Sequence, residues 1–111
     1  ALLRLVEVVG GDVSLLGVLL ESFREEAPKL MADLNEGAAG DPERLRRAAH
    51  TIKSSAKDFG LTVLAEHCTT LEKMARTGEG DPVDLTAKAV AEWARIEPEL
   101  VAATREMMEE A

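Results

Sequence analysis

The chain has 111 residues, and we expect residues 1–111 to form a single domain. Its 46% hydrophobic and 31% charged residues are typical of a globular protein, and aromatic residues make up only 3%. The formal net charge of −8 argues against nucleic acid and an anionic membrane surface as main partners. No apolar run reaches the roughly 20 residues of a membrane span, and the single cysteine excludes an internal disulfide and fits a reducing compartment.

Two helices are predicted in the first third of the chain. Residues 2–9 are strongly apolar and are expected to form a short helix that ends at a glycine pair and caps the rest of the fold. Asp12 is a good N-cap for a second helix that runs to about Glu36, with leucines recurring every three or four residues. Pro28 predicts a kink or a break in this helix, because proline removes a backbone donor and crowds the preceding turn.

Three further helices are marked by proline and glycine. The pairs Asp41-Pro42 and Asp81-Pro82 each combine an N-cap residue with proline at the first helical position. The pattern predicts a loop at 37–40, helices at about 42–59 and 61–76, and a last helix from residue 82 that bends at Pro98. Short loops between long amphipathic helices favour antiparallel neighbours. We therefore expect an all-α fold, an antiparallel up-and-down four-helix bundle with a short additional N-terminal helix.

The predicted helix at 42–59 has a histidine on its polar face. At about 100° per residue, several polar residues fall within about 60° of His50, and an apolar stripe falls on the opposite side. The polar residues are Arg46, Arg47, Lys53, Ser54 and Lys57; the apolar stripe consists of Leu45, Ala48, Ile52 and Phe59. We therefore expect His50 to face solvent within a basic stripe, although the chain as a whole is acidic.

This arrangement suits phosphoryl chemistry. A neutral imidazole is a nucleophile that can accept a phosphoryl group on one nitrogen while the other stays protonated. Lys53 and Lys57, one and two turns after His50, place ammonium groups where the negative charge of a phosphoryl group develops, and Ser54 is placed to donate a hydrogen bond. The alternative is an ordinary surface histidine, since runs of charge are usually solvated faces.

No metal or cofactor site is predicted. A di-iron bundle requires Glu-x-x-His pairs, but Arg47 and Leu64 stand three residues before His50 and His67. His67 is expected at the edge of an apolar stripe, and Cys68 within that stripe as an inert buried thiol.

The stretch from His50 to Gly60 resembles the signature of the histidine-containing phosphotransfer (HPt) domain. That signature is His, any residue, an aliphatic residue, Lys, a small residue, two further small residues, and Gly ten positions after the His. The matching residues are His50, Ile52, Lys53, Ser54, Ser55, Ala56 and Gly60. Similarity to the family extends over nearly the whole chain, through Glu-Ala-Pro at 26–28, Asp41-Pro42, Arg-Arg-Ala-Ala at 46–49, and the segment from Cys68 to Glu72.

The resemblance implies a bundle whose histidine takes a phosphoryl group from the aspartyl phosphate of one receiver domain and passes it to the aspartate of another. It makes His50 the phosphoacceptor, Lys53 the charge that steadies the phosphoryl group, and Glu72 the residue that orients the imidazole by bonding its protonated nitrogen. The implied partners are receiver domains of response regulators or of a hybrid sensor kinase. The chain would be a cytoplasmic monomer without cofactor or nucleotide site, a phosphotransfer intermediate rather than a free-standing enzyme, with Mg²⁺ held by the receiver.

Two positions depart from the family pattern. Ser54 stands where many members have Gly, and it either crowds a docking receiver or bonds the phosphoryl group. Lys57 and Asp58 stand where many members have a small residue followed by Asn. A role for Lys57 as a phosphate-neutralising group therefore rests on its spacing from His50 alone, and Asp58 offsets part of its charge.

Two other functions remain under consideration. One is a helical docking module that binds a receiver or a kinase without phosphotransfer. The other is the dimerisation and phosphoacceptor domain of a sensor kinase, in which an acidic residue usually follows the histidine and a proline comes soon after. Here Thr51 follows the histidine, and no proline appears until Pro82, so this function ranks last.

Overall fold

The computed structural model describes residues 13–110, and within this range it contains four helices and no strands. The helices are α2 (Val13–Ala38), α3 (Pro42–Asp58), α4 (Thr62–Thr77) and α5 (Pro82–Glu110). Each predicted start and end within this range agrees with the structure to within two residues. The expected short helix at residues 2–9 and the N-cap at Asp12 lie outside the described residues.

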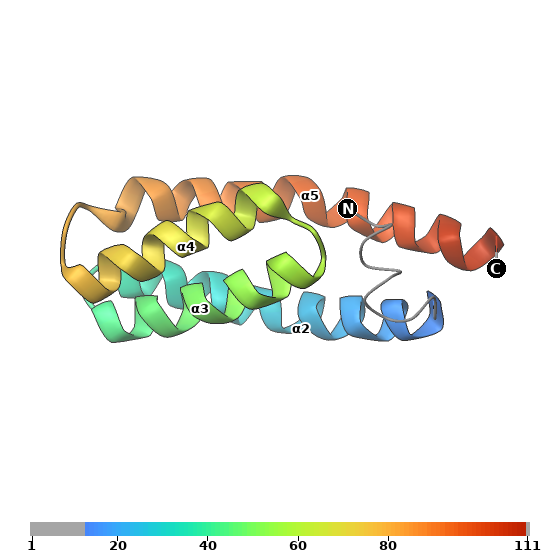
Figure 1. Cartoon of the computed structure of the whole chain (residues 1–111), viewed down its shortest axis with the longest axis horizontal. Coiled ribbons are helices and arrows are strands. Elements are labelled where there is room, and N and C mark those ends of the chain that lie inside the picture. The colour runs from blue at the N-terminus through green and yellow to red at the C-terminus, as the bar shows by residue number, and fades with distance from the viewer. Residues whose placement is uncertain (1–12, 111) are drawn as a thin grey trace.

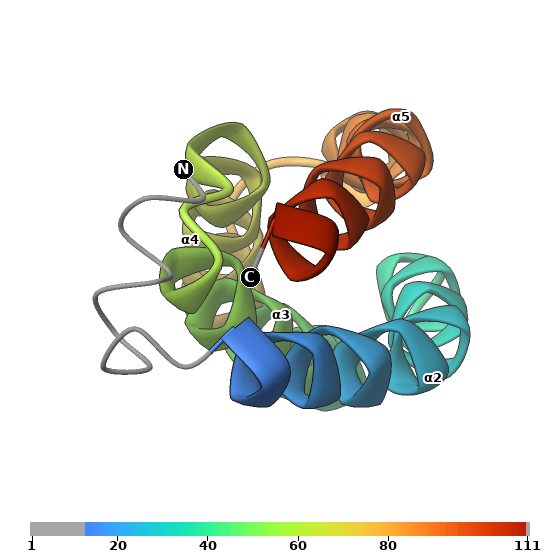
Figure 2. The same cartoon turned by 90° about the vertical axis from the view of Figure 1, so that its right-hand side faces the viewer.

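The four helices form an antiparallel up-and-down bundle, and the predicted all-α fold is confirmed. Successive helices run in opposite directions, and each packs against two others, with α5 closing the bundle against α2 (Figure 1). Seen end-on, α3 and α4 lie on one side and α2 and α5 on the other (Figure 2). α2 and α5 have 26 and 29 residues against 17 and 16 for α3 and α4, so the longer pair extends beyond the shorter one at one end.

The predicted caps explain where the middle helices begin and end. Asp41 accepts a hydrogen bond from the backbone nitrogen of Arg44 at 3.2 Å, which satisfies one of the unpaired donors at the start of α3. α4 ends at Gly78, whose φ of 74° lies in the left-handed region that favours glycine. Gly60, with φ of 69°, serves the turn between α3 and α4 in the same way.

Both internal prolines lie within continuous helices. Pro28 does not break α2, and Pro98 does not break α5. In Figure 2 the blue N-terminal part of α2 runs in a different direction from its cyan C-terminal part, as expected for a helix that contains proline. Of the two outcomes predicted for Pro28, the break is therefore wrong.

The predicted loop at 37–40 begins too early, because Gly37 belongs to α2 and is buried. A Cβ atom at this position would lie 2.5 Å from the backbone nitrogen of Leu45 on α3 and 2.7 Å from its Cα. Glycine is required here by the close approach of two helices rather than by an unusual φ. A pattern within one helix does not reveal such an approach, which explains the wrong prediction.

The core is filled by aliphatic side chains and one cluster of three aromatic rings. The predicted apolar stripe of α3 is buried, since Leu45, Ala48, Ile52 and Phe59 are at most 4% exposed. Phe59 stacks against Phe23 of α2 at a centroid distance of 5.5 Å, and Phe23 also contacts Trp93 of α5 at 4.8 Å. The packed side of α3 thus fixes the rotation of the helix and turns its polar side outward.

Candidate functional site

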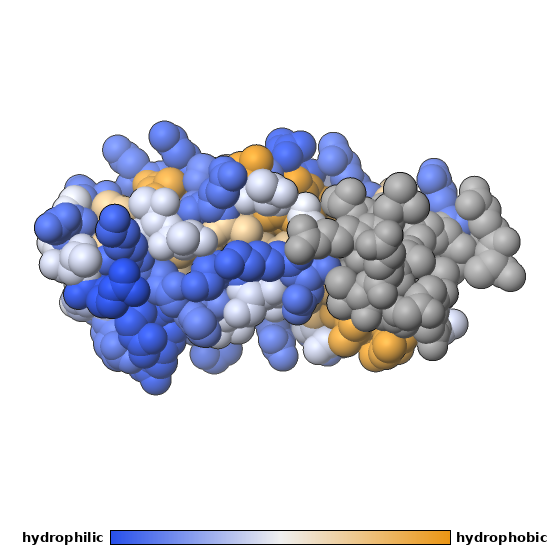
Figure 3. All heavy atoms as spheres, viewed as in Figure 1, coloured by the Kyte–Doolittle hydropathy of each residue, from blue (hydrophilic) through white to orange (hydrophobic). Residues whose placement is uncertain are grey.

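His50 lies in the middle of α3, on the side opposite the buried stripe. Its side chain is 58% exposed, whereas the preceding residue, Ala49, is fully buried. α3 and α4 form the front of the view in Figure 3, where most of the described surface is hydrophilic. The structure therefore places His50 where the helical wheel predicted it, accessible to another protein.

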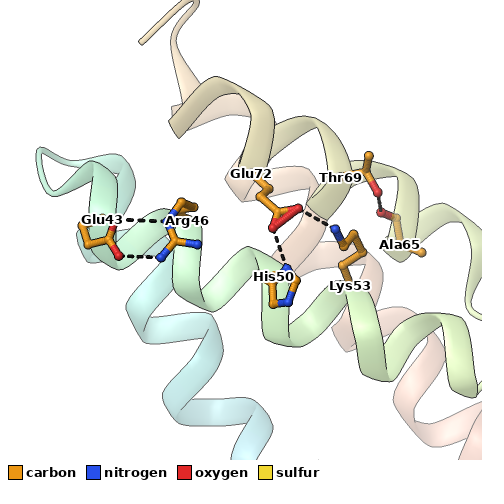
Figure 4. Close-up of polar contacts among 7 residues, drawn as sticks. All are labelled: Glu43, Arg46, His50, Lys53, Ala65, Thr69 and Glu72. Carbon is orange, nitrogen blue, oxygen red and sulfur yellow. Dashed lines mark hydrogen bonds and ion pairs between the residues drawn. The ribbon is translucent and has the colours of Figure 1, made fainter. Parts of the chain in front are cut away.

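The imidazole is held by a carboxylate from the neighbouring helix. Nδ1 of His50 lies 2.6 Å from Oε2 of Glu72 on α4 (Figure 4). An ionised carboxylate can only accept a hydrogen bond, so Nδ1 is the nitrogen that has the hydrogen. In the neutral imidazole the second nitrogen, Nε2, then has a free lone pair, and it lies on the side of the ring away from Glu72.

Lys53 donates a hydrogen bond to the other oxygen of the same carboxylate. Its Nζ lies 2.5 Å from Oε1 of Glu72, and the two side chains are only 19% and 14% exposed. The pKa of Glu72 lies below its ordinary value, chiefly because Lys53 donates a hydrogen bond to it. The hydrogen bond with His50 lowers this pKa further, while partial burial opposes both effects.

The helix geometry accounts for this three-residue cluster. His50 and Lys53 are three residues apart, so they are neighbours on the surface of α3 and both face α4. The turn at Phe59 to Leu61 folds α4 back along α3, and it is closed by a hydrogen bond of 2.8 Å from Leu61 N to Ala56 O. Glu72 is thereby brought opposite the histidine at the edge of the α4 stripe that packs against the core.

Ser54 and Lys57 lie apart from this cluster. Both are exposed, and neither side chain has a hydrogen bond or ion pair with another described residue. They follow His50 by one and two turns of α3, on the polar side of the helix. The structure thus brings together His50, Lys53 and Glu72, and leaves Ser54 and Lys57 available to a group outside the domain.

Several arginines on the part of α3 around His50 form ion pairs with carboxylates. Arg46 makes two hydrogen bonds to Glu43, at 2.6 and 3.0 Å, and Arg44 is bound by Asp33 and Glu36 of α2. The pairing of Arg46 with Glu43 follows from their three-residue spacing in the sequence, but the contacts of Arg44 cross between helices. The basic residues thus lie on the exposed side of α3 as expected, and ion pairs with carboxylates offset part of their positive charge.

The remaining candidates behave as ordinary structural residues. Cys68 is fully buried, and burial raises the pKa of its thiol to about 12, as expected for an inert cysteine. His67 is partly buried beside the apolar stripe of α4. Among residues 13–110 no group of three or more potential metal ligands comes together, and no described helix is long and apolar enough to cross a membrane.

Comparison with known proteins agrees with the resemblance in the sequence. The family model for the Hpt domain matches residues 18–111, a range that includes His50, Lys53 and Glu72. No curated protein and no solved structure matches the chain. Since the match covers well over half of the sequence, the chain belongs to the Hpt domain family, whose members take part in phosphotransfer and interact with receiver domains.

Proposed function

We propose that the chain, as one domain over residues 1–111, is the histidine phosphotransfer protein of a multistep phosphorelay. His50 accepts a phosphoryl group from the aspartyl phosphate of one receiver domain and passes it to the aspartate of another. The observation that supports this most directly is the hydrogen bond between Nδ1 of His50 and Glu72, because it leaves Nε2 as an exposed nucleophile.

The transfer needs no chemical group beyond those of the two proteins and the receiver's Mg²⁺. The lone pair of Nε2 attacks phosphorus, the P–O bond to the aspartate breaks, and its electron pair returns to the carboxylate. Nδ1 keeps its hydrogen, which remains bonded to Glu72. Because acyl phosphate and phosphohistidine are both high-energy compounds, the same steps run in reverse toward the second receiver. The domain contributes positioning and electrostatics.

Three further residues have roles in this proposal. Lys53 places a positive charge beside the imidazole and, in the unphosphorylated protein, donates to Glu72. Ser54 donates a hydrogen bond to the phosphoryl group and Lys57 neutralises part of its charge; both side chains are exposed and unengaged within the described chain. The proposed partners are receiver domains of response regulators or of a hybrid sensor kinase, and the proposed setting is a monomer in the cytoplasm.

The test is to mix the purified protein with a phosphorylated receiver and Mg²⁺ and to measure phosphate on the bundle that is labile in acid and stable in base. His50→Gln should abolish this label without unfolding the protein, because the side chain is exposed and lies outside the core. His67→Gln is the matched control and should be labelled normally.

Two results would count against phosphotransfer by His50. Label that persists in His50→Gln would refute the assignment of the phosphoacceptor. A folded bundle that binds several phosphorylated receivers but is labelled by none would favour the alternative, a docking module without phosphotransfer.

A further inference from the structure

We propose that Arg46 is a phosphoryl-binding residue of this domain, which donates from Nη1 to the phosphoryl group on His50, and that Glu43 is the positioning residue that holds its guanidinium in place. The inference rests on the proposed function and assigns a role to an ion pair within α3 that is separate from the contacts of Glu72. Its consequence is a phosphohistidine that is more stable relative to the aspartyl phosphate of a receiver.

Arg46 stands one helical turn before His50 on the same side of α3. Side chains of a helix lean toward its N-terminus, so the imidazole leans over the turn that contains residue 46. On the helical wheel Arg46 lies about 40° from His50, on the side that faces α4. Arg47 lies about 60° from His50 on the other side, where it lines a groove between α2 and α3. Of these two neighbouring arginines, Arg46 is therefore the one directed toward the site.

The guanidinium of Arg46 is fixed by two parallel hydrogen bonds to Glu43. Nε lies 3.0 Å from Oε2 and Nη2 lies 2.6 Å from Oε1. Such a bidentate pair sets the plane of the guanidinium as well as its position. The third nitrogen, Nη1, has two hydrogens and makes no hydrogen bond to any described residue, and in Figure 4 it lies on the side of the guanidinium toward His50. Arg46 thus presents free donors in a fixed orientation.

The electrostatics support this placement. The pKa of Arg46 is raised, chiefly by its hydrogen bonds to Glu43 and by the charge of that carboxylate, and the charge of Glu72 adds to the effect. Glu72 contacts the ring of His50, so the guanidinium lies within electrostatic reach of the ring. The side chain of Arg46 is 39% exposed against 69% for Arg47, so water competes less for its donors.

A phosphoryl group needs donors that the other cations supply only in part. It brings a charge of about −2 and three acceptor oxygens to the ring. Lys53 is already in an ion pair and is only 19% exposed. Ser54 and Lys57 both lie on the C-terminal side of His50. Arg46 adds donors on the N-terminal side, and their charge-assisted hydrogen bonds form only in the phosphorylated state.

The test is the equilibrium constant for phosphoryl transfer to the domain, measured after mixing it with a phosphorylated receiver and Mg²⁺. This constant compares the free proteins, so contacts in the docked complex cancel. Arg46→Gln should lower it about fivefold, whereas the matched control Arg47→Gln should stay within about twofold of the wild type. Arg46→Lys keeps the charge but lacks the planar fork, so it should restore only part of the loss.

Glu43→Ala tests the positioning role through the sign of its effect. The substitution removes a negative charge near the phosphoryl group, so an effect of charge alone would raise the equilibrium constant. Loss of the fixed guanidinium should instead lower it. In the Arg46→Gln background the same substitution should not lower the constant, because no guanidinium remains to be positioned. Circular dichroism checks that each variant is folded.

NMR of the arginine side chains gives a structural counterpart that needs no receiver. The protein is phosphorylated with phosphoramidate, and the guanidinium signals are compared before and after. The Nη1 hydrogens of Arg46 should shift downfield when they bond the phosphoryl oxygens, while the guanidinium signals of Arg47 should stay in place.

The outcomes separate this inference from the proposed function. An equilibrium constant that is unchanged in Arg46→Gln, or lowered equally in Arg47→Gln, would overturn the role of Arg46 while leaving His50 as phosphoacceptor. A constant that rises in Glu43→Ala would overturn the positioning role of Glu43. Failure of a receiver to phosphorylate His50 in the wild type would instead refute the proposed function.

Discussion

Replacing Gly37 by alanine tests a close approach between α2 and α3. The added methyl carbon would lie 2.5 Å from the backbone nitrogen of Leu45, 2.7 Å from its Cα and 2.8 Å from its Cβ. These atoms belong to the backbone or are attached directly to it, so no rotation of a side chain can relieve the contact. The start of α3 must move away from the end of α2.

The cost of this movement can be worked out from the distances. Ordinary carbon contacts begin at about 3.5 Å, so the helices must separate by about 1 Å. Overpacking of this kind costs up to about 3 kcal/mol, and alanine gains about 1 kcal/mol over glycine within a helix. We therefore expect a net loss of about 2 kcal/mol in the free energy of unfolding, or about 10 °C in melting temperature.

The assay is urea unfolding followed by circular dichroism, with Ala32→Gly as the control in the same helix. Ala32 is exposed, so this variant measures the helix-propensity term alone and should lose about 1 kcal/mol. Phosphorylation of Gly37→Ala should persist while the protein is folded, because the contact lies more than one turn before His50. Unchanged or increased stability of Gly37→Ala would show that α2 and α3 do not approach as closely as described.

Three further predictions concern single side chains. The thiol of Cys68 should react with iodoacetamide only after unfolding, because it is fully buried and burial raises its pKa to about 12; rapid alkylation of the native protein would contradict this. The pKa of Glu72 is lowered in the folded state, so its contribution to stability is present above its ordinary pKa of 4.5 and is lost as the pH falls through the folded value. Urea unfolding of the wild type and of Glu72→Gln should therefore differ most above that pH and converge in acid, and a constant difference would argue against the ion pair. Thr86→Val should raise the free energy of unfolding by about 1 kcal/mol in the same assay, because the buried hydroxyl has no hydrogen-bond partner among the described residues; a loss would indicate a partner for it.

The fold was predictable because its signals are local in sequence. Asp41-Pro42 and Asp81-Pro82 mark helix starts, and Gly60 and Gly78 mark helix ends, through backbone preferences that act within a few residues. The outward direction of His50 followed from the apolar stripe on the opposite side of α3. Only the family resemblance pointed to Glu72, and the structure adds its distance to the ring.

The other features of the site depend on contacts between helices, and a helical wheel of a single helix does not show such contacts. Lys53 falls in the polar stripe of α3, yet its ammonium group turns toward α4 and binds Glu72. Arg44 is likewise bound by Asp33 and Glu36 of α2. A long flexible side chain at the border of a helix face goes to the nearest opposite charge, and that charge is fixed only when the helices are packed.

The aromatic cluster gives the protein a built-in optical reporter. Trp93 is the only tryptophan in the sequence, and it is 9% exposed beside Phe23. Its indole contacts the ring of Phe23 across the interface between α5 and α2. Its fluorescence therefore reports the cohesion of the bundle core, and separation of α5 from α2 would shift the emission toward that of tryptophan in water.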